Sequence, residues 1–184
     1  MDKGIIAALE LKVLDELDAA MTKVEAGDTD PLEGAPHNVD EAWAFFTAGG
    51  EGLSATAEKR AADFGLGGKV SEPVVKALGD TQAAARDGDP ARLRAAREQA
   101  RGAMNLIFAL AVIKYAEAAV DDDVARAEGM AFSWGLRSDL PERRLARVET
   151  AFEQPGERSA AVARDTLNAS LGELGLDGPL PELD

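Results

Sequence analysis

Apolar residues recur every three or four positions along most of this 184-residue chain, and no segment shows the alternation of a β-strand. The first apolar stripe consists of Ile6, Leu9, Val13, Leu17, Met21 and Val24. This spacing places the apolar side chains on one face of a helix. The sequence therefore predicts an all-α fold, and short connections between about eight helices predict a helical bundle.

Glycines, prolines and a run of aspartates divide the chain into the expected helices. Asn38 and Glu41 are predicted to form an N-cap with a glutamate at the third helical position, after a loop over 27–36. The tail, 177–184, is expected to be extended or loose. The predicted helices cover residues 5–25, 38–48, 53–64, 73–86, 91–120, 124–137, 141–152 and 157–174.

The chain also resembles itself at long range. The matched pairs are Ile6-x3-Glu10-x2-Val13 with Ile113-x3-Glu117-x2-Val120, Glu41-x2-Ala44-Phe45 with Glu128-x2-Ala131-Phe132, Phe64 with Phe152, and Asp80-Thr81-x2-Ala84 with Asp165-Thr166-x2-Ala169. We interpret these matches as a tandem duplication of a four-helix unit with pseudo-two-fold symmetry, 1–88 and 89–176, packed as one domain. A chance match within an Ala- and Glu-rich chain is the alternative.

The charge is strongly acidic, with 34 Asp and Glu against 20 Lys and Arg and a net charge of −14. Such a surface repels phosphate, which argues against a nucleic-acid partner. It suits a halophilic protein or an acidic protein from a GC-rich genome, and both interpretations stay open. The chain lacks cysteine, its longest apolar stretch (103–113) is too short to span a membrane, and no signal-peptide pattern is visible.

Two glutamates, Glu10 and Glu117, occupy equivalent places on apolar helical stripes. A carboxylate directed into a core is costly unless it is paired or bound to a cation. Glu41 and Glu128 begin the next helix of each predicted repeat, so a pseudo-two-fold packing would bring all four carboxylates together. The candidate metal ligands are Glu10, His37, Glu41, Glu117 and Glu128, with Tyr115 beside them in a supporting position.

Other interpretations of these residues remain open. Glu41 can serve only to cap the helix with Asn38. Glu10 and Glu117 can lie at the edges of their stripes, in solvent or in ion pairs, and His37 can be an ordinary loop histidine. The Glu-x2-His spacing of ferritin-like di-iron sites is absent, as are the common motifs of hydrolases, phosphate-binding loops and zinc peptidases. No catalytic residues are predicted, and an enzyme is not expected.

Two segments resemble a known family: residues 37–46, His-Asn-Val-Asp-Glu-Ala-Trp-Ala-Phe-Phe, and residues 115–117 followed by 128–132. They are similar to the low iron-inducible periplasmic (iron-assimilation) proteins of algae and to related haloarchaeal secreted domains. The resemblance implies a helical, extracytoplasmic protein that takes part in iron acquisition. It also implies that His37, Glu41, Glu117 and Glu128 handle metal.

Two hypotheses follow. The first is a non-catalytic metal-binding domain, with iron as the leading metal and manganese, magnesium or calcium also compatible with oxygen ligands. The second is a helical module that binds a protein partner and no metal. Burial of the four glutamates distinguishes them, because solvent-exposed carboxylates need no cation.

Overall fold

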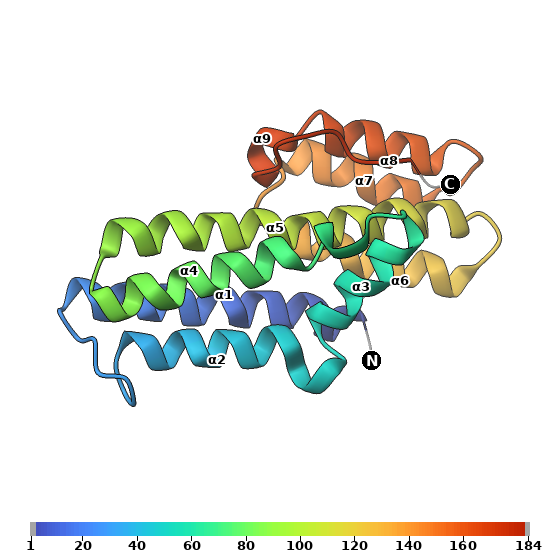
Figure 1. The fold of residues 1–184 in the computed structure, drawn as a ribbon. Helices are drawn as coiled ribbons and strands as arrows, with labels where there is room; N and C mark the ends of the chain where they lie inside the picture. Colours follow the sequence, from blue (N-terminus) through green and yellow to red (C-terminus); the bar gives the residue numbers. More distant parts are fainter. Residues whose placement is uncertain (1–2, 183–184) are drawn as a thin grey trace.

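The computed structural model describes residues 3–182, and all its regular elements in that range are helical. Figure 1 shows the helices running mostly side by side, with α7 to α9 lying across one side of α5. The α-helices are α1 (Lys3–Glu25), α2 (Ala35–Thr47), α3 (Leu53–Asp63), α4 (Glu72–Asp87), α5 (Pro90–Ala118), α6 (Asp123–Ser133), α7 (Glu142–Glu153), α8 (Ser159–Asn168) and α9 (Leu171–Leu174). Single 3-10 turns lie at η1 (Ala48–Gly50), η2 (Gly67–Lys69) and η3 (Trp134–Leu136). The predicted all-α fold is confirmed.

The core is organised around α5. The first part of this helix closes a four-helix ring, in which α1 packs on α2, α2 on α4, α4 on α5 and α5 on α1. The second part extends beyond that ring and is covered by α3, α6 and α8. Residues 107–113 of α5 are buried without interruption, and a helix that is apolar all round needs such cover on every side. Within 3–182, no helix is both long and apolar enough to cross a membrane.

Helix starts follow capping chemistry, with one correction. The side chains of Asp89 and Asp122 accept backbone N–H bonds at the starts of α5 and α6. The predicted Asn38 cap is wrong: α2 begins earlier, with Pro36 in its first turn. Asn38 instead lies inside the helix, is buried, and donates from Nδ2 to Glu16 Oε2 at 2.7 Å.

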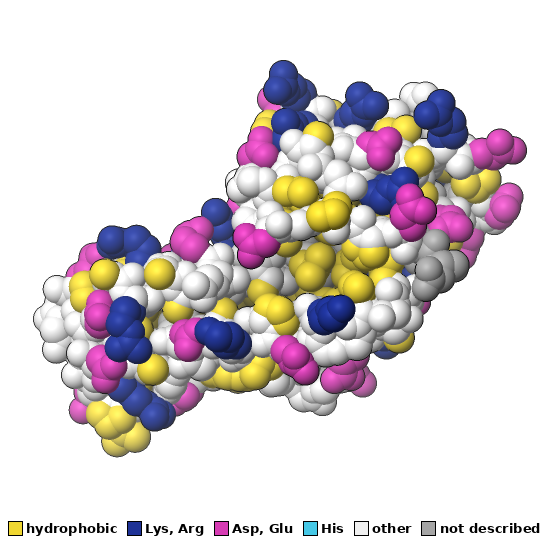
Figure 2. All heavy atoms as spheres, turned by 45° about the horizontal axis from the view of Figure 1, so that its top comes forward, with side chains coloured by type: hydrophobic (Ala, Val, Ile, Leu, Met, Phe, Trp, Pro, Cys, Tyr) yellow, Lys and Arg dark blue, Asp and Glu magenta, His cyan; other side chains and the backbone are white. Residues whose placement is uncertain are grey.

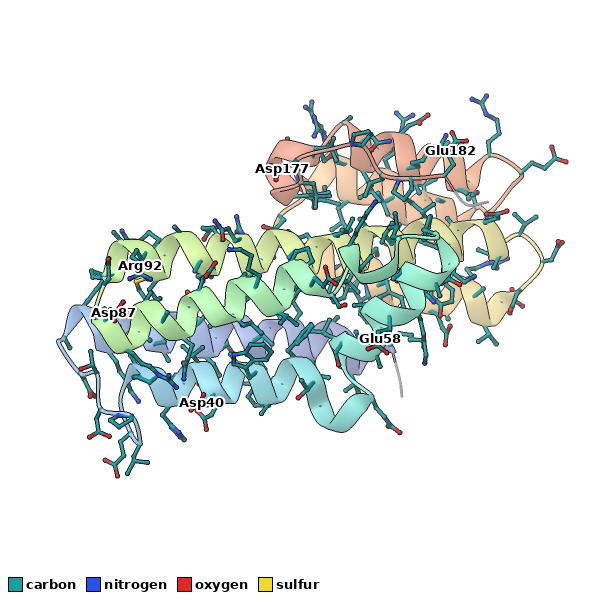
Figure 3. The ribbon with its side chains drawn as sticks, viewed as in Figure 1. Asp40, Glu58, Asp87, Arg92, Asp177 and Glu182 are labelled. Carbon is teal, nitrogen blue, oxygen red and sulfur yellow. The ribbon has the colours of Figure 1, made fainter. Side chains whose placement is uncertain are left out.

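The last predicted helix is divided into α8 and α9 at Ala169 and Ser170. The tail after α9 is extended but not loose: Leu180 is buried, its N–H donates to Asn168 Oδ1 at 2.8 Å, and Glu182 pairs with Arg164 at 2.7 Å. Residues 183 and 184 of the predicted tail lie outside the described residues. Figure 3 places Asp177 and Glu182 at opposite ends of this tail, beside α8.

Close backbone contact fastens the C-terminal segment to α5. A Cβ atom added at Gly102 would lie only 2.5 Å from the carbonyl oxygen of Gly175, which caps α9 with a φ of +68°. Asn105 of α5 also donates from Nδ2 to the carbonyl of Leu174 at 3.0 Å. Figure 2 shows apolar side chains gathered where this segment meets the bundle.

The predicted duplication is not confirmed. The α1–α2 pair and the α5–α6 pair pack alike, but α4 packs on α2 whereas α8 packs on α7 and α5. The domain division at 88 and 89 stays a prediction.

Candidate functional site

The four predicted glutamates do not converge. Glu41 Oε1 lies 3.6 Å from His37 Nε2, one turn away on α2, and both side chains are 46% exposed. Glu117 is exposed on α5 and lines a cavity of about 500 Å³ against α8 and the tail, together with Arg164 and Glu182. Of the four, only Glu10 is buried, at 1% exposed.

No group of three or more His, Cys, Asp or Glu side chains in residues 3–182 is arranged to hold a metal ion. The four carboxylates are therefore not gathered at one place, because Glu10 faces the bundle, whereas Glu117 lies on an exposed face of α5. The assignment of these residues as metal ligands stays a prediction. Acidic residues are instead spread over separate elements, as Asp40 on α2, Glu58 on α3 and Glu182 in the tail illustrate in Figure 3.

The structure does bring two of the predicted residues, Tyr115 and Glu128, to one place. They lie where the start of α1 meets α3, α5 and α6. Lys3 Nζ of α1 lies 3.8 Å from Glu128 Oε1 of α6, and the ring of Tyr115 stacks on Phe132 with centroids 5.5 Å apart. A cavity of about 270 Å³ opens beside them, with Tyr115 and Phe132 in its wall.

Arg60 of α3 is the decisive side chain of this cavity. It is only 6% exposed, and its guanidinium lies 5.3 Å from the centroid of the Tyr115 ring. Its Nη2 pairs with Asp63 Oδ2 at 2.9 Å, but Nε and Nη1 are buried without a hydrogen-bond partner. Because a guanidinium stays charged in proteins, Arg60 cannot lose a proton to reduce the cost of burying these donors.

The wall of the cavity carries more cations than carboxylates, although two of these cations, Lys3 and Arg60, pair with Glu128 and Asp63 beside it. Its wall holds Lys3, Lys59 and Arg60 against one carboxylate, that of Glu51. Burial raises the pKa of the Tyr115 phenol, as does its hydrogen bond to Glu128, while a hydrogen bond to Arg60 and the charge of Arg60 oppose the shift. We call this cavity, with Lys3, Glu51, Lys59, Arg60 and Tyr115, the Arg60 pocket. Its donors suit an oxygen-rich anion, because charge-assisted N–H···O bonds are among the strongest in proteins.

The position of Arg60 in the sequence is itself a signal of burial. Leu53, Ala57, Ala61 and Phe64 form the buried stripe of α3 and its end, and Arg60 falls on the same stripe. An arginine at such a position must find a partner or a ligand. The contributions of Lys3 and Lys59 required the fold, since nothing local links them to Arg60.

Comparison with known families matches residues 1–131 to the low iron-inducible periplasmic proteins. The chain belongs to this family. The matched span ends within α6 and includes every residue that lines the Arg60 pocket except Phe132. α7, α8 and α9 lie beyond it. No curated protein and no solved structure matches the chain.

Proposed function

We propose that this protein is a non-catalytic, extracytoplasmic iron-binding protein that takes up iron as an anionic ferric complex in the Arg60 pocket. The observation that carries the proposal is the buried guanidinium of Arg60, with Nε and Nη1 unpartnered at the wall of a cavity. The family description, low iron-inducible and periplasmic, supports both the metal and the compartment.

An anionic complex fits this pocket better than a bare metal ion does. The polar side chains Lys3, Lys59 and Arg60 in the wall are hydrogen-bond donors only, so they offer no ligand to a free cation. Small hydroxycarboxylates bind ferric iron through oxygen and leave the complex negatively charged, so the same side chains attract it. The iron then arrives with most of its ligands already in place, which removes the need for a preformed cluster of protein carboxylates.

Two protein oxygens are available to complete the coordination of such a complex. Tyr115 lines the pocket and Glu128 is its hydrogen-bond partner, and phenolate and carboxylate oxygens are ligands that suit ferric iron. Lys3 pairs with Glu128, so a ligand that draws this carboxylate inward also changes the position of Lys3. The cavity, about 270 Å³, suits a small ligand rather than a large organic chelator.

The test is calorimetric titration of the protein with ferric citrate. The wild type should bind it, and Arg60→Gln should lower the affinity at least about tenfold, because a charge-assisted hydrogen bond contributes about 1.5–3 kcal/mol. Lys59→Gln, at an exposed position, should weaken binding by a smaller factor without affecting the fold. Arg92→Gln is the matched control, since Arg92 pairs with Asp87 on the surface where α4 meets α5 (Figure 3).

Two results would overturn the proposal. One is a wild-type affinity that neither Arg60→Gln nor Lys59→Gln changes. The other is tight binding of aquated ferric ion that excludes citrate, since that requires a carboxylate site elsewhere.

A further inference from the structure

Glu10 is a buried carboxyl group for which the proposed iron site has no use. It lies at the middle of the buried face of α1, 1% exposed, and neither Oε1 nor Oε2 has a hydrogen-bond partner. Its neighbours one turn away on the same helix, Ile6, Ala7, Val13 and Leu14, are all buried and apolar. Nothing on its own helix can therefore compensate a charge on Glu10.

Two charged groups face Glu10 from other elements. One is Asp139, in the turn after η3, whose side chain is only 2% exposed, and the other is Arg101 of α5. Arg101 is already engaged twice: Nη1 lies 3.0 Å from Asp139 Oδ1, and Nη2 lies 2.9 Å from Glu98 Oε2. An ionised Glu10 would thus add a third carboxylate to one guanidinium, which favours the neutral, protonated form.

At the contacts of α1 with α2, α5 and α6, the polar and charged groups that the structure describes are already paired with one another. At the α1–α2 contact the polar pair is Glu16 with the neutral amide of Asn38. At the α1–α6 contact Lys3 is paired with Glu128. On the α5 side, Arg97 is held by Asp18 and Glu98. Burial and the neighbouring Asp139 raise the pKa of Glu10 well above its usual 4.5, against a smaller opposing effect of Arg101.

Glu10 and Asp139 lie on the two segments that hold one side of the Arg60 pocket, since α1 packs against both α6 and η3. α1 carries Lys3 and Ile6 into the pocket wall, about two turns and one turn before Glu10. The segment that ends at Asp139 continues directly from α6, which carries Glu128 and Phe132. Separation of Glu10 from Asp139 would therefore move Lys3 relative to Glu128 and open the pocket wall.

We infer that a proton on Glu10 locks α1 against the α6–α7 connection and thereby keeps the Arg60 pocket in its anion-binding form. Loss of that proton places two adjacent carboxylates in a buried site, loosens the start of α1 and lowers the affinity of the pocket for anions. The affinity of the pocket for anions therefore weakens as the pH rises. A protein that releases its ligand in acid would show the opposite dependence. This inference rests on the proposed function for the identity of the ligand, but the lock itself does not.

The test uses sulfate as the anion, because its charge is constant between about pH 5 and pH 9. The wild-type affinity for sulfate should fall by about tenfold across that range, a coupling typical of two linked sites. Glu10→Gln should bind sulfate with an affinity that hardly changes with pH. His37→Gln is the control, since His37 is the sole histidine of the chain and must leave the wild-type profile intact.

Hydrogen exchange of the α1 amides without ligand separates this inference from the proposed function. Exchange, corrected for its intrinsic pH dependence, should rise with pH in the wild type and stay constant in Glu10→Gln. If that difference appears but ferric citrate does not bind, the proposed function fails and the lock stands. If both proteins show the same exchange and the same sulfate profile, the lock is overturned, whatever the result with iron.

Discussion

Glu10 and Arg60 are both buried and both have polar atoms without a hydrogen-bond partner, but their charges are of opposite sign. Glu10 is 1% exposed and Arg60 is 6% exposed. A carboxyl group can leave the charged state by taking up a proton, and the pKa of Glu10 is raised accordingly. A guanidinium has no such option, so Arg60 must rely on Asp63, on the face of Tyr115, and on whatever enters the cavity beside it.

The difference indicates which buried charge is suited to binding and which to regulation. A group that can neutralise itself responds to pH and needs no ligand. A group that cannot do so gains from every anion that reaches it. Substitutions at Asp63, Glu10 and His37 and a change of salt concentration test this contrast.

Asp63→Ala should destabilise the protein by about 2–3 kcal/mol, because removal of one partner leaves a buried charge uncompensated. This loss of stability is smaller than that expected for a fully buried ion pair, since the Asp63 side chain is 22% exposed. Urea denaturation measures the change. Added sulfate should recover part of the loss by binding the folded state.

The matched control is Asp15→Ala, which removes an exposed pair with Lys12 and should cost no more than about 0.5 kcal/mol. Equal losses in the two variants would mean that Arg60 does not depend on Asp63, and the contrast with Glu10 would disappear.

Glu10→Gln should gain stability relative to the wild type as the pH rises above the usual carboxyl range, because the raised pKa of folded Glu10 makes wild-type stability depend on pH. The sign follows from proton binding. Above the usual pKa of 4.5 the unfolded chain has lost the proton that folded Glu10 retains, so wild-type stability falls with rising pH until folded Glu10 also titrates.

Thermal melts at several pH values measure this slope, and Glu58→Gln, on the exposed side of α3, is the control. A slope that survives in Glu10→Gln would assign the buried proton to another group.

Salt should affect the two regions unequally. An increase in KCl from about 0.05 M to about 1 M should weaken sulfate binding several-fold, because screening and chloride competition act on the partly exposed Lys3 and Lys59. The pH slope of stability due to Glu10 should hardly change, because buried charges are screened much less. Equal salt sensitivity of both quantities would contradict the burial of Glu10.

His37→Gln should have the smallest effect, with ferric citrate affinity within about twofold and stability within about 0.5 kcal/mol of the wild type. The His37–Glu41 pair is half-exposed on α2 and stands apart from the Arg60 pocket. Titration of the variant with ferric citrate measures the affinity. A large loss of ferric citrate affinity would mean that the iron site includes His37, as the resemblance to the family implies.

The helices were predictable because periodicity and capping are local. Asp89 at the start of α5 and the aspartates before α6 have clear signatures in the sequence, and both caps are present. The start of α2 differs from the predicted one because Pro36 occupies the first turn of the helix. Asn38 can cap a helix, but it also satisfies its amide inside one by donating to Glu16.

The candidate site was less predictable because it depends on packing between distant segments. Glu10 and Glu117 occupy similar stripes, yet only Glu10 is covered by other helices. Burial of Arg60 could have been inferred from its place among the apolar residues of α3. The proximity of Lys3 to Arg60, and of Asp139 to Glu10, depends on how α1 packs against α6 and the turn after η3, and no local pattern records it.

On the ribosome, α1 to α4 emerge before most of the helix that completes their ring. Arg101 follows within α5, and Asp139 leaves the exit tunnel only after all of α6 and η3. Until then, the charges that surround Glu10 in the folded protein are missing, and the wall of the Arg60 pocket that α6 supplies does not exist. Contacts between such distant parts of a chain form slowly. A nascent chain with this topology therefore closes late in its synthesis, and chaperones have a long interval in which to engage it before it closes.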